Sequence, residues 1–524
     1  MKRAGLLVLA FALLPIFAAA QPSIVLLGGK IFTNDPAQPF AEALAIKGDT
    51  ILAVGTDAEI QALGGDANTR RIRLRGALVI PGLNDAHTHP SLGPVGLQLG
   101  TNRDSTAADL AAAIGSAIAE TSPDLWLIGT VGRTIMLDET VNRAKLDQLA
   151  PNRKVLLRSF TGHGLILSSR AIQAIGLQEN VSDPPGGRFG HNADGTLNGR
   201  ILEYAEYPVL RKISALTQQP GDLANALRDF ASQAIQFGIT SIQAMPFDED
   251  DATFAAALKA ADTPLRVRHI FVPLDVPPVV LSTSVLRPKP QTSGIKWVLD
   301  GTPIEKGAAV RTPYPDGGGS GVLNFTNLTP LIKPGLSMNQ QLLVYAGGDQ
   351  AIAMLLKALQ DTPGVNWPSL RPRIEHADGL LPDLDTQARN LGVVAVLNPT
   401  HFEARTLYPQ GRFMRAKSLL AIPLKVAIGS DGVLNPYLNI LLAVERPDNN
   451  PSEALTREEA VAAYTSGSAF AEGQDNKGVL APGKLADLAV LNQDIFRIRA
   501  NQLPDTFSVL TIIGGKIAHE AAVP

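Results

Sequence analysis

The chain has 524 residues, of which 45% are hydrophobic and 18% are charged, and its formal net charge is −3. This composition is typical of a globular protein with one large domain and a smaller one. The small net charge gives no argument for binding nucleic acid or an anionic membrane surface. Because the chain has no cysteine, it excludes disulfides, thiolate metal ligands, a cysteine nucleophile and a lipid anchor on cysteine.

The first segment, MKRAGLLVLAFALLPIFAAAQPS, has the pattern of a secretory signal peptide. Lys2 and Arg3 are followed by an apolar run and then by small residues, which predicts cleavage after Ala20. A membrane anchor is the alternative, but the run is short and Pro15 interrupts it. We therefore expect a periplasmic or secreted protein with no membrane association after cleavage. A homo-oligomer is left open.

Segments near the two ends of the chain share a strand-rich pattern. Residues 21–77 contain SIVLLGGKIFT and ALAIKGDTILAVG, and residues 475–524 contain LADLAVL and LTIIGGKIAHE. Each segment with a glycine turn predicts a hairpin, and LADLAVL predicts one further strand. The matched ends predict one small β-sandwich built from both, with two independent hairpins as the alternative.

Residues 78–474 alternate apolar, strand-like runs with helical stretches, which is the pattern of βα units around a parallel sheet. One clear helix is DQAIAMLLKALQD, for which Asp349 is the predicted N-cap. The candidate strands are ALVIPGL, KVLLRSF, TSIQAM, RVRHIF, IKWVLD, LLVYAGG, PRIEHAD, VVAVLNP and KVAIGSD. Nine strands are one too many for a (β/α)₈ TIM-type barrel. KVLLRSF is the surplus strand, because it lies in a long stretch of about residues 100–235 that predicts an inserted subdomain.

The stretch PGLNDAHTHP places two of the eight histidines one residue apart, after an apolar strand. Side chains alternate along a strand, so His87 and His89 point the same way, about 7 Å apart along it. Two imidazoles on one side suit a shared metal ion. A chance pairing is the alternative.

In a barrel of this kind, active-site residues lie at the carboxyl ends of the strands. Lys296 lies in an apolar strand, where an unpaired ammonium group would be costly. The candidate residues at or near strand ends are His87, His89, Lys296, Tyr345, His376, His401 and Asp431. Potential ligands at so many strand ends favour a metal site over scattered chance.

These motifs, in this order, resemble those of the amidohydrolase superfamily, in the branch that includes N-substituted formamide deformylase. PGLNDAHTH resembles the metal motif of the first strand, IKWVLDG the lysine motif of the fourth, RIEHAD the histidine motif of the sixth and KVAIGSDG the aspartate motif of the eighth. KGVLAPGKLADLAVLN is similar to the segment that leads back into the small β-domain. TGHGLILSS is similar to a stretch whose histidine reaches the substrate pocket. The resemblance covers essentially the whole chain after residue 20.

The resemblance implies a divalent metal such as zinc on His87, His89 and Asp431. It further implies that Lys296 is carbamylated and bridges to a second metal held partly by His376. Asp431 would take a proton from the attacking water and deliver it to the leaving nitrogen. The catalytic candidates that would hold the substrate carbonyl or its oxyanion are His163 and His401, with ordinary loop histidines as the alternative.

One position departs from the family pattern. Where relatives carry a fifth-strand histidine, this chain reads YAGGDQA, with Tyr345 in the ligand position. A phenol ligates a metal only as phenolate, and its ordinary pKa is about 10. We therefore expect one tightly bound ion and a second that is weak or absent. VGRTI and IQAM also differ from the family pattern.

The expected function is an exported metal-dependent amidohydrolase acting on a small-molecule amide. The bond would be a carbon–nitrogen bond outside peptides, in an N-acyl or N-formyl amide or a cyclic amide, and metal-activated water would attack it. Deamination of a ring and ester hydrolysis are left open. The alternative is a catalytically silent barrel that binds a small molecule, which Tyr345 favours and the other retained ligands oppose.

Overall fold

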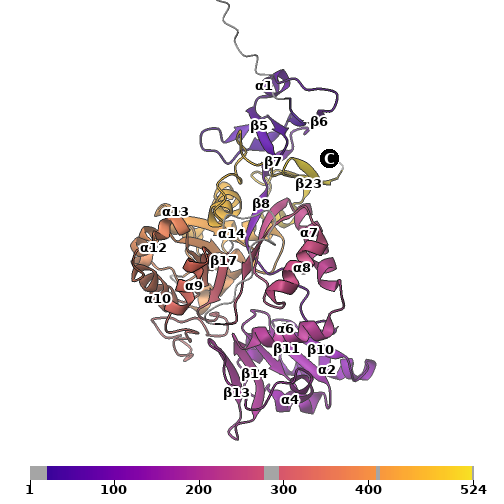
Figure 1. Ribbon diagram of the computed structural model, residues 1–524, viewed down its shortest axis with the longest axis vertical. Helices are drawn as coiled ribbons and strands as arrows, with labels where there is room; N and C mark the ends of the chain where they lie inside the picture. The colour runs from indigo at the N-terminus through magenta and orange to yellow at the C-terminus, as the bar shows by residue number, and fades with distance from the viewer. Residues whose placement is uncertain (1–20, 276–293, 409–412, 522–524) are drawn as a thin grey trace, which may run out of the picture.

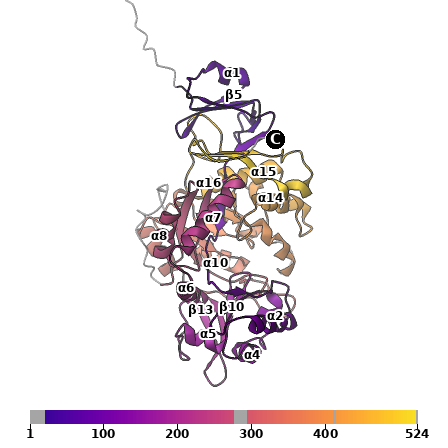
Figure 2. The same ribbon diagram turned by 90° about the vertical axis from the view of Figure 1, so that its right-hand side faces the viewer.

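The computed structural model describes residues 21–275, 294–408 and 413–521, so the predicted signal peptide, residues 1–20, lies outside the described residues. The described chain has three parts along its longest axis (Figures 1 and 2). Two small sheets occupy one end, a barrel the middle and an inserted subdomain the other end. Among the described residues, no helix combines the length and apolar character needed to cross a membrane.

The middle part is an eight-stranded parallel sheet that curls into a nearly closed barrel, which confirms the predicted fold class. Along the sheet the strands follow chain order: β8 (Leu83–Thr88), β15 (Ile239–Ala244), β16 (Arg266–Phe271), β17 (Gly294–Val298), β18 (Gln341–Tyr345), β19 (Arg373–Glu375), β20 (Val394–Leu397) and β21 (Lys425–Ile428). Nearly every residue in them is buried, as expected for parallel strands covered on both faces. Near-continuous apolar runs follow from this double burial.

Helices cover the outside of the barrel. They are α7 (Asp222–Gln236), α8 (Asp251–Ala261), α9 (Thr329–Ser337), α10 (Asp349–Gln360), α11 (Trp367–Leu370), α12 (Asp385–Asn390), α13 (Lys417–Ala421), α14 (Pro436–Glu445), α15 (Arg457–Ala462) and α16 (Ser468–Ala471), with a π-helical segment, Ala463–Gly467, joining the last two. The helix predicted from DQAIAMLLKALQD is α10, but its N-cap is Gly348. The prediction of Asp349 as N-cap was wrong because the Asp349 carboxylate instead accepts hydrogen bonds from Arg311, at 2.6 Å from Nε and 3.0 Å from the backbone nitrogen.

The first barrel strand differs from the prediction. ALVIPGL forms β7 (Leu78–Pro81), which pairs with β2 (Lys30–Phe32) and β22 (Leu488–Leu491) in a terminal sheet. The barrel begins two residues later, with β8. The sequence could not predict this change of sheet, because buried strands in either sheet are built from the same kinds of apolar residue. KVLLRSF lies outside the barrel, as predicted.

The two terminal sheets form the predicted composite sandwich. One has the order β5 (Thr50–Gly55), β4 (Ala43–Lys47), β1 (Ile24–Leu27), β6 (Arg70–Arg73), and the other β24 (Lys516–Glu520), β23 (Ser508–Ile513), β22, β7, β2, β3 (Phe40–Ala41). Leu44 of the first sheet and Leu488 of the second share one buried cluster. Helix α1 (Asp57–Ala62) covers the first sheet, and its Thr56–Glu59 capping box satisfies the helix start.

Two of the three predicted hairpins are present in these sheets. β4–β5 and β23–β24 are antiparallel pairs. The third prediction was wrong: β1 and β2, on either side of Gly28-Gly29, belong to different sheets. The glycine turn therefore passes the chain from one layer to the other.

The inserted subdomain contains a six-stranded sheet with helices around it. Its strands are β9 (Leu97–Gln98), β10 (Trp126–Val131), β11 (Lys154–Ser159), β12 (Gly164–Leu167), β13 (Gly187–His191) and β14 (Leu197–Glu203), and its helices are α2 (Ala107–Glu120), α3 (Arg133–Met136), α4 (Arg143–Leu149), α5 (Ser169–Ala174) and α6 (Glu206–Thr217). α7, within the stretch predicted as insertion, packs on β15 and α8 of the barrel instead. Its amphipathic pattern did not show which face of the molecule it covers.

Candidate metal centre

His87 and His89 are oriented by hydrogen bonds at their second ring nitrogens. His87 lies on β8 and is fully buried, and its Nδ1 lies 2.6 Å from Glu375 Oε2. His89 follows the strand, and its Nδ1 lies 2.7 Å from the carbonyl oxygen of Met245. A carboxylate and a carbonyl both accept hydrogen bonds, so each Nδ1 carries the proton and each Nε2 presents a lone pair. Each imidazole therefore turns toward Asp431 the nitrogen that a metal ion would bind.

Glu375 is itself held as a carboxylate by Arg373. The Arg373 guanidinium donates to both Glu375 oxygens, at 2.7 and 3.0 Å, and both side chains are fully buried. Burial alone would raise the pKa of Glu375, but Arg373 and His87 more than offset burial and lower it to about 2. The group behind His87 is thus a permanent hydrogen-bond acceptor.

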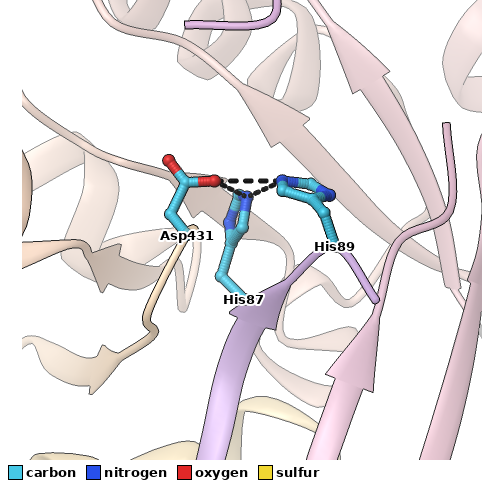
Figure 3. A group of neighbouring side chains, drawn as sticks. All are labelled: His87, His89 and Asp431. Atoms are coloured by element: carbon cyan, nitrogen blue, oxygen red, sulfur yellow. Dashed lines mark hydrogen bonds and ion pairs between the residues drawn. The ribbon is translucent and has the colours of Figure 1, made fainter. Parts of the chain in front are cut away.

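Asp431 completes a cluster of three possible ligands (Figure 3). Its Oδ1 lies 3.0 Å from His89 Nε2 and 3.4 Å from His87 Nε2, and the two imidazole nitrogens are 3.1 Å apart. Burial would raise the pKa of Asp431, but the histidines around it, His376 first, hold it well below the usual range. Asp431 is therefore an anion facing two nitrogen lone pairs.

The spacing of these three atoms fits a tetrahedral metal ion. Zinc bound to histidine nitrogen and carboxylate oxygen at about 2.0–2.2 Å would hold neighbouring ligand atoms roughly 3.3–3.6 Å apart. The observed separations of 3.0–3.4 Å are close to this. Mixed imidazole and carboxylate donors suit zinc and similar divalent ions.

The backbone around Asp431 brings β21 against β8. The Asp431 amide donates to the His87 carbonyl at 2.9 Å, and the Asp85 carboxylate accepts from the Ser430 amide at 2.9 Å. Asp431 has φ +46° and His376 has φ +72°, a left-handed conformation that is uncommon for residues other than glycine. Such conformations persist where the surroundings enforce them and are concentrated at functional sites.

Lys296 extends from β17 to the same place. Its Nζ lies 3.0 Å from His87 Nε2 and 4.9 Å from the centre of the Phe247 ring. Burial lowers the pKa of Lys296 to about 8, so the neutral amine is more abundant at neutral pH than in an ordinary lysine. The neutral amine is the form that reacts with carbon dioxide, which makes the position compatible with a carbamate.

A second group of possible ligands lies on the other side of Asp431. It consists of His376, Asp378 and His401. Asp431 Oδ2 lies 3.0 Å from His401 Nε2 and 3.5 Å from His376 Nε2. One carboxylate thus faces both groups, with Oδ1 toward the first and Oδ2 toward the second. His401 comes from a 3₁₀ helix, Pro399–Leu407, rather than from a strand end.

Tyr345 ends β18 close to this second group, but its hydroxyl has another partner. The hydroxyl donates to the Gly301 carbonyl at 3.3 Å, while the ring lies 4.5 Å from that of His376. Burial, followed by Asp300 and Asp378, raises the pKa of Tyr345 well above its usual value of 10. The side chain is therefore a neutral phenol, which makes Tyr345 a poorer candidate ligand than Asp378.

A cavity of about 770 Å³ connects these groups to the inserted subdomain. Its lining includes His89, Lys296, Tyr345, His376, His401 and Asp431 from the barrel, and Arg158, His163 and Glu206 from the insertion. His163 lies between β11 and β12, with Nδ1 3.0 Å from Glu203 Oε2. Burial lowers the pKa of His163, but Glu203 more than offsets burial and raises it to about 9. His163 is thus a cationic hydrogen-bond donor facing the cavity that reaches Asp431.

A family model described as the amidohydrolase family matches residues 71–519. The chain belongs to this family. YtcJ of Bacillus subtilis (strain 168) is 27% identical to this amidohydrolase over 94% of the chain and 98% of its own length. N-substituted formamide deformylase of Arthrobacter pascens is 23% identical over 95% of the chain and 98% of its own length. Among solved structures, an uncharacterized metal-dependent hydrolase from Pyrococcus furiosus aligns over 90% of this chain and 100% of its own, with a TM-score of 0.65 and 21% identity.

Three carboxylates near the site of this amidohydrolase were not predicted as site residues. Glu375 and Asp378 flank His376 in RIEHAD, and the need of a metal-bound histidine for a carboxylate partner could have indicated Glu375. Glu203, the partner of His163, lies 40 residues further along the chain. Nothing in the sequence links these two positions, because a subdomain fold brings them together.

Proposed function

We propose that this amidohydrolase is an exported, metal-dependent enzyme that hydrolyses a carbon–nitrogen bond outside peptides, in an N-acyl or N-formyl amide or a cyclic amide. The observation that carries the proposal is the cluster of His87 Nε2, His89 Nε2 and Asp431 Oδ1, whose separations are close to those around a tetrahedral ion. The Nδ1 atoms of both histidines are hydrogen-bonded to other groups, which leaves the Nε2 atoms to face the ion. The name of the Arthrobacter pascens relative supports an amide substrate. The cavity beside the cluster supports a small molecule.

His87, His89 and Asp431 would hold the first ion, and His376 with Asp378 or a Lys296 carbamate would hold a weaker second one. A bound divalent ion would supply a water of lowered pKa and a polarised substrate carbonyl. Asp431 would accept the proton of that water through a carboxylate oxygen and then donate it to the leaving nitrogen as the carbon–nitrogen bond breaks. This assignment is supported by the position of Asp431 between the two groups of ligands.

Two histidines would act on the substrate itself. His163 carries a proton toward the cavity and would donate a hydrogen bond to the carbonyl oxygen as negative charge develops there. His401 lies 3.0 Å from Asp431 Oδ2 and would hold that carboxylate in place or donate to the same substrate oxygen. An N-acyl or N-formyl amide would give a free acid, such as formate, and an amine, whereas a cyclic amide would open to one molecule that carries both groups.

A panel of N-formyl, N-acetyl and cyclic amides tests the proposal on purified protein. Removal of metal with a chelator should abolish hydrolysis, and zinc should restore it. Lys296→Ala should also abolish hydrolysis, and partial rescue by added acetate would support a carbamate, because a free carboxylate can occupy the vacated position. Tyr345 in the ligand position favours one rival, a silent barrel. Metal-loaded protein that binds panel members but hydrolyses none would establish that rival.

A further inference from the structure

Glu206 is a buried carboxyl group in the cavity wall that has no hydrogen-bond partner. It is the first residue of α6, three positions after the end of β14, and its exposed fraction is 0%. It contributes to the lining of the same cavity as the candidate metal ligands. Within the described residues, neither of its carboxyl oxygens accepts or donates a hydrogen bond. Buried polar atoms are partnered in the great majority of cases, so these two oxygens are expected to take a partner from outside the chain, a water molecule or a group of a ligand.

The nearby cations are already paired with other carboxylates. Arg158 and His163 are the cationic groups that act electrostatically on Glu206. Arg158 Nη1 lies 2.8 Å from Asp248 Oδ2, and His163 Nδ1 lies 3.0 Å from Glu203 Oε2. Glu206 therefore shares these two cations with Asp248 and Glu203, which pair with them directly. Burial raises the pKa of Glu206 well above its usual value, which is the behaviour of a carboxyl group that lacks a counter-ion.

An apolar surface joins Glu206 to the candidate metal centre. Tyr207, the next residue in the chain, stacks on Phe247 with ring centres 4.7 Å apart. The Phe247 ring in turn lies 5.0 Å from the His89 ring. A ligand whose carbonyl lies at His89 could therefore lay an apolar body along these two rings and reach Glu206 with its far end.

We propose that Glu206 is a specificity-determining residue that binds a positively charged nitrogen, such as a primary ammonium group, at the end of the substrate away from the scissile bond. A primary ammonium group has three donors and no acceptor, which matches the two unpartnered oxygens of Glu206, and its positive charge would hold that carboxyl group in the ionised form. The substrate class that follows is an amide with an apolar linker and a basic group. Its identification as substrate rests on the proposed function, whereas the binding of a cation does not.

Calorimetric titration of the full chain with hexylammonium chloride and with 1-hexanol, at pH 7 and without turnover, tests the proposal. The two probes share an apolar body and differ in charge. We expect hexylammonium to bind at least tenfold more tightly than hexanol, and Glu206→Gln to remove that preference. Glu403→Gln is the matched control, because Glu403 lines the same cavity but is 55% exposed and lies 3.6 Å from Arg103. It should bind both probes as the wild type does.

Equal binding of the two probes by the wild type would overturn the proposal, and so would unchanged hexylammonium binding by folded Glu206→Gln. The comparison of probes on the wild type holds even if the variant does not fold. Tight, Glu206-dependent binding of hexylammonium, together with no hydrolysis of panel amides that carry a terminal ammonium group, would reject the proposed hydrolysis and leave the binding of a cation standing.

Discussion

At the scale of single residues, the candidate centre depends on partners that are not themselves ligands. Glu375 and the Met245 carbonyl fix the protons of His87 and His89, and Arg373 keeps Glu375 ionised. Loss of such outer partners typically reduces metal affinity 10- to 100-fold. Tyr345 is poorly suited to take the place of a histidine ligand. Its hydroxyl is engaged by Gly301, and burial disfavours phenolate.

Tyr345 variants should separate the roles of the phenol oxygen and the ligand position. Because the hydroxyl donates to Gly301 rather than facing a ligand group, Tyr345→Phe should leave metal content unchanged and cost only about 1 kcal/mol of unfolding free energy. Tyr345→His should raise the metal content toward two ions per chain, since an imidazole would stand beside His376. Metal analysis and chemical denaturation measure both effects. A loss of metal in Tyr345→Phe would mean that the phenol oxygen is a ligand after all.

At the scale of elements, the contact between β21 and β8 brings together the first group of possible ligands. The chain between β21 and Asp431 passes very close to His87, and Gly429 makes this approach feasible. A Cβ atom at Gly429 would lie 2.5 Å from the Cβ and 2.6 Å from the backbone nitrogen of His87. Both distances are shorter than van der Waals contact, and neither His87 atom lies at the far end of a flexible side chain that could move away.

Gly429→Ala should therefore force β21 away from β8, separate Asp431 from His87 and lower metal affinity. Overpacking of a rigid core site typically costs about 1–3 kcal/mol of unfolding free energy. The matched control is Gly115→Ala, because a Cβ atom there meets nothing within 4 Å inside α2. That control should be neutral or slightly stabilising, since alanine is the better helix former. Equal metal content and stability in the two variants would contradict the close approach.

At the scale of the whole molecule, the sequence predicted the architecture well where a pattern was local. The alternation of strands and helices indicated the barrel, and strand-end residues indicated His87, Lys296, His376 and Asp431, which the fold brings together. Apolar patterns alone could not assign β7 to the terminal sheet and β8 to the barrel. Glu203 and Glu206 were not predicted as site residues either, because their positions depend on the fold of the inserted subdomain and on how it packs over the barrel mouth.

Export remains a prediction about the whole chain. The basic, apolar and small-residue pattern ending at Ala20 predicts that protein recovered from the periplasm or medium begins near Gln21. Intact-mass spectrometry measures this directly. Recovery of a membrane-anchored form that retains Met1 would contradict it.

The most direct test of the central claim is the ratio of metal to chain, measured by mass spectrometry of the elements, in the wild type and in the double variant His87→Ala/His89→Ala. The matched control is His191→Ala/His519→Ala, which removes two histidines from strands β13 and β24, outside the barrel. We expect at least one divalent ion per chain in the wild type and the control, and almost none in the first double variant. A folded His87→Ala/His89→Ala protein that retains the wild-type metal content would contradict the account.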